Sequence, residues 1–343
     1  MNGRRGVLTA GTWCVDLNKT IARWPAEDTL NRYLSIDRRG GGSGCNMAID
    51  LKRLDSHMPV STMGVVGDDD GGRFLWSECD AFGVERAKLV ARSGAATPFT
   101  DCFNSLESGR RTHFFFPGVS DALTPDDFDF ASSSARVLHL GLPGVHAKMD
   151  GPWGGETTGW AATLKKARAA GLMTNLEMAS APFDELRAFG RSCAPSLDLM
   201  IVNDYEIGGV AGVETREAGL TGRAVGAKVE AALRVALDLG PMRLVVAHFP
   251  EGAIALTRDG GRAALGSVAI PPDRIAGVNG AGDAFAAGTL YGWHEGWGLE
   301  ACLRLGHACA AASMREVSTT AGVGTVAECL ELAEKWGLRP PPA

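Results

Sequence analysis

The chain has 343 residues, of which 45% are apolar and 22% charged, and its formal net charge is −6. This length and composition suit one large globular domain, alone or with a small appendage. The negative charge, and the lack of a basic cluster longer than a pair such as Arg110-Arg111, argue against nucleic acid as a partner.

The cysteines and the N-terminal segment indicate a cytoplasmic protein. The eight cysteines are dispersed and form no C-x-x-C pair, so the sequence indicates neither a zinc knuckle nor a redox pair. Polar residues interrupt the N-terminal apolar run by Asp16, and no apolar run reaches the roughly 18 residues of a membrane span. We therefore expect a cytoplasmic protein with no membrane partner.

Short strands and helices alternate along most of the chain. The expected strands are the β-branched runs 7–15, 60–66, 136–142, 197–203 and 243–249, and the expected helices include 45–54, 158–171, 222–240 and 284–297. Strands that alternate with helices form a mostly parallel sheet covered on both faces. The sequence thus predicts a three-layer α/β/α core.

Two segments, 13–41 and 96–118, break this alternation. Both have the polar alternation and the turn residues of paired strands, so we expect one small antiparallel β-sheet beside the core, serving as a lid. The predicted core then comprises residues 1–12, 42–95 and 119–343, and the predicted lid comprises 13–41 and 96–118. The apolar run HFFF in the lid predicts that two lids can pair into a homodimer.

The first glycine-rich loop leads into the predicted helix 45–54. It contains Gly41, Gly42 and Gly44, and it ends at Asn46, whose amide can both donate and accept hydrogen bonds. The loop is not a P-loop, because no Lys-Ser or Lys-Thr follows, and no G-x-G-x-x-G follows the first strand, which argues against a dinucleotide-binding dehydrogenase. A tight turn with a helix cap would also explain it.

A second loop, GVNGAGDAF at 277–285, also leads into a predicted helix. Small residues at a helix start (Gly280, Ala281 and Gly282) let an anion approach the unpaired backbone amides. Asp283 follows directly and could accept the proton of an attacking hydroxyl beside a bound phosphoryl group. The alternative is that Asp283 is an ordinary N-cap.

Together, GGSGCN at 41–46 and NGAGDAFAAG at 279–288 resemble the two signatures of the ribokinase-like (PfkB) family of carbohydrate and nucleoside kinases. Further landmarks agree in their order along nearly the whole chain: Asp16, IVNDYEIGGVAG, AHFPEGAIAL and LGHACAAAS. The resemblance implies transfer of the γ-phosphoryl of ATP to a hydroxyl, commonly a primary one, of a sugar or sugar derivative. A nucleoside such as adenosine remains an alternative acceptor, and a non-catalytic sugar or nucleotide sensor remains an alternative function.

The resemblance also implies roles for individual residues. Asp283 would be the general base, and the amides of Gly280, Ala281 and Gly282 would form the anion hole. The acceptor would be held by Asp16, Gly41, Gly42, Asn46 and, from the lid, Asn104. The nucleotide would be held by Asn203, Glu206, His248, Gly252, Asn279 and His307, with Glu206 serving Mg²⁺ through water.

Several of these roles have plainer alternatives. Glu206 could be a solvated residue in the first turn of a helix, His307 could simply pack, and Asp16 could cap a turn. Specificity would depend on the lid and the facing cleft, here Trp13, Asp16, Asn18, Phe103, Asn104, His113 and Phe115. Many members have Asp-Thr where this chain has Gly277-Val278, so the resemblance does not carry over activation by potassium.

Overall fold

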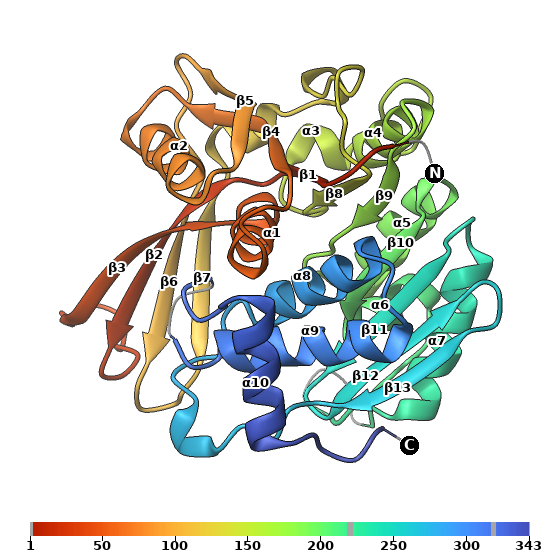
Figure 1. The fold of residues 1–343 in the computed structure, drawn as a ribbon. Helices are drawn as coiled ribbons and strands as arrows, with labels where there is room; N and C mark the ends of the chain where they lie inside the picture. The colour runs from red at the N-terminus through yellow and green to blue at the C-terminus, as the bar shows by residue number, and fades with distance from the viewer. Residues whose placement is uncertain (1–2, 218–221, 317–319, 343) are drawn as a thin grey trace.

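The structure is a computed structural model that describes residues 3–217, 222–316 and 320–342. Its larger sheet has nine strands in the order β13-β12-β11-β10-β9-β8-β1-β4-β5 (Figure 1). The strands from β5 to β11 in this order pair in parallel, and β12 and β13 add an antiparallel edge. Their bounds are β1 Val7–Gly11, β4 Val60–Gly67, β5 Glu85–Arg92, β8 Val137–Gly141, β9 Met173–Leu176, β10 Leu199–Asn203, β11 Leu244–Phe249, β12 Gly252–Thr257 and β13 Arg262–Gly266.

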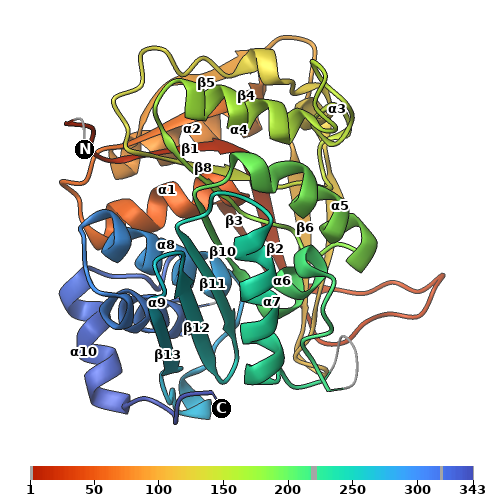
Figure 2. The ribbon, with the colours of Figure 1, turned by 90° about the vertical axis from the view of Figure 1, so that its right-hand side faces the viewer.

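Helices cover both faces of this sheet, as Figure 2 shows. One face carries α1 (Ser43–Leu54), α2 (Asp70–Phe82), α8 (Ala281–His294), α9 (Leu299–Ser313) and α10 (Val326–Trp336). The other carries α3 (Ala147–Asp150), α4 (Gly159–Ala169), α5 (Phe183–Cys193), α6 (Asp204–Ala211) and α7 (Gly226–Asp238). Short 3₁₀ turns lie at Gly118–Ala122, Pro125–Asp127, Ala194–Ser196 and Pro272–Arg274. The predicted three-layer α/β/α fold is confirmed.

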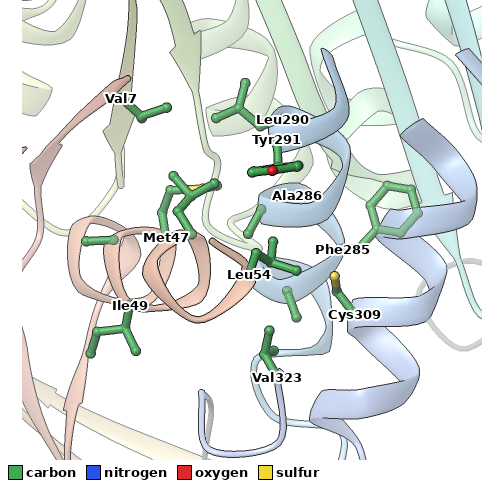
Figure 3. Close-up of a cluster of buried hydrophobic side chains, with 14 of the residues drawn as sticks. Val7, Met47, Ile49, Leu54, Phe285, Ala286, Leu290, Tyr291, Cys309 and Val323 are labelled. Atoms are coloured by element: carbon green, nitrogen blue, oxygen red, sulfur yellow. The ribbon is translucent and has the colours of Figure 1, made fainter. Parts of the chain in front are cut away.

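Burial on both faces explains why the core strands are continuously apolar. Neighbouring residues of one strand belong to different hydrophobic cores: Val7 and Val137 pack on the α1 and α8 side, whereas Leu8 and Leu138 pack on the α4 side. On the first side, Met47 and Leu54 of α1 face Leu290 of α8 (Figure 3). Burying such side chains stabilises the fold by roughly 1.5–3 kcal/mol each, before chain entropy is counted.

A second, separate sheet has four strands in the order β3-β2-β6-β7. Their bounds are β2 Cys14–Ile21, β3 Tyr33–Gly41, β6 Phe99–Ser105 and β7 Arg111–Phe116. These strands fall inside the segments 13–41 and 96–118, and the division into core and lid remains our prediction.

The prediction that this sheet is antiparallel throughout is wrong at its centre. The outer pairs β2–β3 and β6–β7 are antiparallel, but β2 and β6 run in parallel. The reason lies in the core: β2 follows β1 and β6 follows β5, and β1 and β5 both end at the same edge of the parallel sheet. Because β2 and β6 both run from this edge of the larger sheet into the smaller sheet, they point in the same direction.

The described ranges contain no helix that is both long and apolar enough to cross a membrane. All eight cysteines are buried and free.

Candidate active site

Two helices on the same face of the core begin at glycines whose backbone conformation excludes most other residues. Gly42 precedes α1 with φ 85°, and an added Cβ would lie 2.6 Å from the carbonyl oxygen of Thr12. Gly280 precedes α8 with φ 72°, in the left-handed region. The glycines of both sequence signatures therefore turn the chain sharply into a helix whose first amides have no partner within the helix itself.

Asp283 lies in the first turn of α8 and faces α1. The N-cap of α8 is Gly280, so the interpretation of Asp283 as an N-cap is wrong. The side-chain amide of Asn46 donates a 2.8 Å hydrogen bond to Asp283 Oδ2, across 237 positions of sequence. The structure thus brings the two signatures together at one carboxylate.

Glu177 and His139 extend this contact into a polar network. Glu177 follows β9, and its carboxyl group is within hydrogen-bonding contact of that of Asp283. His139 Nε2 lies 2.9 Å from Glu177 Oε2 and 3.0 Å from Ser43 Oγ, while the Asn175 amide donates to Nδ1 at 2.9 Å. With Nδ1 accepting, the proton of the neutral imidazole is on Nε2 and is donated to Glu177.

Burial keeps protons on this network at neutral pH. Burial first, and then the nearby Glu177 carboxyl, raise the pKa of Asp283 to about 8, and burial raises the pKa of Glu177 to about 7. Burial lowers the pKa of His139 to about 4, so this ring is neutral. Because two carboxylates in contact cannot both ionise at low cost, Asp283 and Glu177 share one proton near pH 7.

Asp16 comes from the smaller sheet and lies close to Gly41. It is a buried residue in the middle of β2, which excludes the alternative that it caps a turn. A Cβ on Gly41 would lie 2.2 Å from Asp16 Oδ2, so glycine is required for this carboxylate to occupy its place. Burial raises the pKa of Asp16 to about 6, and the charge of Asp283 adds to the rise, which places the two acids within electrostatic range.

A cavity of about 420 Å³ opens beside the start of α8, between that helix, α9 and the ends of β10 and β11. Asn203, His248, Ala281, Gly282 and His307 all line it. The rings of His248 and His307 flank Phe285, with centroids 4.8 and 4.9 Å away. Burial lowers the pKa of His248 to about 4 and that of His307 to about 3, so both rings are neutral. This cavity combines an apolar, ring-lined wall with the anion-binding end of a helix.

Asn203 and Glu206 form a capping box at the start of α6. Asn203 Oδ1 accepts from the Glu206 amide at 2.8 Å, and the Asn203 amide donates to Glu206 Oε2 at 3.0 Å. Ser180 donates to the other oxygen of Glu206 at 3.2 Å. The Glu206 side chain is buried, so the alternative of a solvated first-turn residue is wrong, and burial raises its pKa to about 8.

Three other predicted nucleotide or acceptor residues are not among the described residues that line this cavity. Of the described residues, those lining the cavity do not include Gly252, Asn279 or Asn104. Gly252 begins β12, where an added Cβ would lie 2.4 Å from the Leu265 carbonyl oxygen, and the Asn279 carbonyl accepts from Ser313. Asn104 lies in β6 on the smaller sheet. Neighbouring strands therefore account for the glycine at position 252.

Sequence reasoning missed Glu177, His139 and Ser43. A signal for Glu177 was available, because it is a charged residue directly after a short, mostly buried strand, and the carboxyl ends of parallel strands meet at the ligand-binding edge. His139 lies inside an apolar strand, and nothing in the local pattern distinguishes it from a packed core histidine.

Comparison with known proteins agrees with this geometry. The family described as pfkB family carbohydrate kinase matches residues 6–325. The chain belongs to the pfkB family. As a member, it is an ATP-dependent sugar kinase, a phosphotransferase with an alcohol group as acceptor.

Two curated relatives and one solved structure illustrate the likeness. The chain is 26% identical to a 5-dehydro-2-deoxygluconokinase of Shouchella clausii, over 96% of this chain and 95% of that protein. It is 22% identical to a nucleoside kinase of Methanothermobacter thermautotrophicus, over 99% of this chain and 100% of that protein. Its fold matches Arabidopsis thaliana ribokinase, solved with ribose and ATP, with a TM-score of 0.74, 18% identity, and coverage of 96% of this chain and 98% of that one.

Proposed function

We propose that this kinase phosphorylates a hydroxyl, typically a primary one, of a sugar or sugar derivative, with Asp283 as the general base. The observation that carries the proposal is the 2.8 Å bond between Asn46 and Asp283, which joins the two signature loops at one carboxylate. An acceptor held by Asp16, Gly42 and Asn46 would then have its hydroxyl beside Asp283.

The base requires an ionised Asp283, a state that the hydrogen bond from Asn46 favours and that burial and the neighbouring Glu177 carboxyl oppose. Asn46 donates to one oxygen of Asp283, and a protonated Glu177 would donate to the carboxylate as well. The shared proton would then reside on Glu177, which leaves Asp283 free to accept the proton of the acceptor hydroxyl. His139 would hold Glu177 in place through its 2.9 Å bond.

The start of α8 supplies the electrostatic part of the mechanism. The first backbone bond within the helix runs from the Ala284 amide to the Gly280 carbonyl, so the preceding amides have no partner inside the helix. The amides of Gly280, Ala281 and Gly282 and the helix dipole would stabilise the charge on the transferred phosphoryl group. The 420 Å³ cavity would hold the nucleotide, with its base near His248, Phe285 and His307.

Mg²⁺ would enter with ATP rather than occupy a site built by the protein. Within the described ranges, no three histidine, cysteine, aspartate or glutamate side chains gather as a metal-binding group. Both oxygens of Glu206 accept hydrogen bonds from Asn203 and Ser180, which fits a contact to Mg²⁺ through water better than direct ligation. The metal would neutralise phosphate charge during transfer.

The outer face of the smaller sheet supports the prediction of a homodimer through the lid. Phe99, Phe114 and Phe116 are exposed there, and Trp24 stacks on Phe114 with ring centroids 6.3 Å apart. An apolar patch of this kind usually marks an interface. Sedimentation should give twice the chain mass, and Phe114→Asp should give the monomer; a wild-type monomer at micromolar concentration would contradict the pairing.

The first experiment is ADP release from Mg-ATP with a panel of pentoses, hexoses, sugar acids, sugar phosphates and nucleosides. The panel includes 5-dehydro-2-deoxygluconate and ribose, because one relative is a 5-dehydro-2-deoxygluconokinase and one structural neighbour is a ribokinase. It also includes adenosine as a nucleoside, because another relative is a nucleoside kinase. Asp283→Asn should reduce turnover by roughly 10² to 10⁴, the usual contribution of a positioned base. Near-normal turnover in that variant would refute the assigned role, and ATP binding without transfer to any acceptor would favour the sensor.

A further inference from the structure

One face of the smaller sheet turns toward the core and carries Asp16. Side chains alternate along a strand, so Asn18 shares this face, and the register adds the residues paired with it across the ladder. Asn18 pairs with Cys102, which pairs with His113, and the next rung in the same direction pairs Thr20 with Asn104 and Asn104 with Arg111. The face beyond Asp16 is therefore polar, rung after rung.

Several polar atoms on this face are buried and have no hydrogen-bond partner. Both side-chain atoms of Asn18 are in this state although the residue is only 4% exposed, and so are Asn104 Nδ2 and Arg111 Nη1. Three of these four atoms can only donate a hydrogen bond. Leaving buried donors unpaired costs about 1–3 kcal/mol each, and more for a charged group, so such a cluster indicates a missing acceptor.

Arg111 is the unusual member, because it is a partly buried cation without a counter-ion. No carboxylate of the described residues lies within 4 Å of it, and burial lowers the pKa of its guanidinium. Lys19, on the opposite face of the same sheet, is bonded to Asp101 at 2.6 Å. The protein thus pairs the cation on the outer face and leaves the one on the inner face unpaired.

The positive charge of Arg111 acts on residues that lie nearer to the acceptor site. Its rung lies four residues, about 13 Å of strand, beyond the Asp16 rung. The guanidinium nevertheless acts on groups one rung nearer: after burial, its charge lowers the pKa of His113 and offsets part of the rise at Cys102. Asn18 and Arg111 therefore present unpaired donors on neighbouring rungs of the same face, beyond the Asp16 rung of the acceptor site.

We infer that the acceptor carries an anionic group, a carboxylate or a phosphate, bound by Arg111 with Asn18 and Asn104 at the end opposite the hydroxyl that receives the phosphoryl group. This inference rests on the proposed function and narrows its substrate class. A carboxylate or phosphate accepts hydrogen bonds only and pairs well with a guanidinium, which matches a pocket of unpaired donors. A neutral sugar would leave the Arg111 charge uncompensated.

Isothermal titration in the presence of a non-hydrolysable ATP analogue tests the inference independently of transfer. The probes are two matched pairs, D-gluconate with D-glucitol and glucose 1-phosphate with methyl glucoside, which separate the two sources of negative charge. Wild type should bind at least one anion more tightly than its neutral partner. Arg111→Met should weaken that binding by about 10-fold to 100-fold, and Arg111→Lys should restore part of it. Arg110→Met, which changes the exposed neighbouring arginine, should bind as wild type does.

Two results would overturn the inference. One is equal or tighter binding of the neutral member in both pairs, and the other is loss of affinity for the ATP analogue rather than for the anion in Arg111→Met. The second result would assign Arg111 to the nucleotide phosphates. Failure of the proposed function gives a different result. Anion binding would still depend on Arg111, but no acceptor would give ADP release that Asp283→Asn reduces.

Discussion

Changing Glu177 to glutamine should move the acid limb of the pH profile without abolishing activity. Glu177 contacts Asp283, and the two carboxyl groups titrate as a pair with pKa values of about 7 and about 8. In Glu177→Gln the like charge is gone, and the new amide can still donate to Asp283. We expect the pKa of Asp283 to fall, because only its burial then opposes ionisation.

The size of the change follows from the usual effect of a neighbouring charge, about 1–3 units of pKa. A fall of about 2 units would bring the pKa of Asp283 from about 8 to about 6. At pH 7, where about half of Glu177 is ionised, wild type would have about 9% of its Asp283 ionised and the variant about 91%. Relative to its own plateau, the variant should be on the order of 10-fold more active at pH 7.

The assay is kcat/KM for the best acceptor between pH 5.5 and 9, at saturating Mg-ATP. Glu185→Gln is the matched control, since Glu185 is an exposed glutamate in the first turn of α5, and its profile should follow wild type. An unchanged acid limb in Glu177→Gln would refute the coupling between the two carboxyl groups. A loss of kcat at every pH, with no shift, would assign Glu177 a purely structural role.

Three further predictions test other parts of the structure. In steady-state kinetics, Gly41→Ala should raise the acceptor KM by about 10-fold or more and leave the KM for ATP unchanged. The reason is that the new Cβ would lie 2.2 Å from Asp16 Oδ2 and would displace that carboxylate. An unchanged acceptor KM would show that Asp16 does not bind the acceptor. Asp50 is buried in α1 with both carboxylate oxygens unpaired, and burial raises its pKa in the folded state. The ionised carboxylate therefore destabilises the folded state increasingly as the pH rises above the pKa of Asp50 in the unfolded chain. Asp50→Asn should raise Tm more at pH 8 than at pH 4, and equal shifts in Tm would contradict this. Because Gly277-Val278 replaces the usual Asp-Thr, exchanging potassium for N-methylglucamine should leave kcat unchanged, and a marked fall would show that a cation site persists.

The parts of the site that the sequence predicts are those with a local cause. A glycine before a helix has the same consequence wherever the helix lies, so the loops before α1 and α8 could be recognised from their residues alone. The prediction that the two loops lie in one site, where Asn46 now contacts Asp283, came from the family resemblance and not from their spacing in the sequence. The roles of Asn203 and Glu206 as a capping box follow from four consecutive residues and were equally accessible.

The parts that escaped prediction depend on distant neighbours. The parallel pairing of β2 and β6 is set by the edge at which two core strands end, which no pattern within 13–41 or 96–118 encodes. Glu177 acquires its role only because β9 ends beside α8, and Arg111 only because the ladder places it on the same face as Asn18. Polar residues of this kind look like ordinary surface residues until the register is known.

The packing between α1 and α8 has a consequence for how variants of this enzyme should be interpreted. Asn46 directly precedes Met47, and Asp283 lies two residues before Phe285. Met47 and Phe285 belong to the hydrophobic core that Figure 3 shows, so α1 and α8 each carry a site residue beside a core residue. Alignment of the base with its partner is therefore only as accurate as the fit of those apolar side chains. A substitution such as Met47→Ala, which touches neither substrate, should be detected in turnover at temperatures well below the point at which the protein melts.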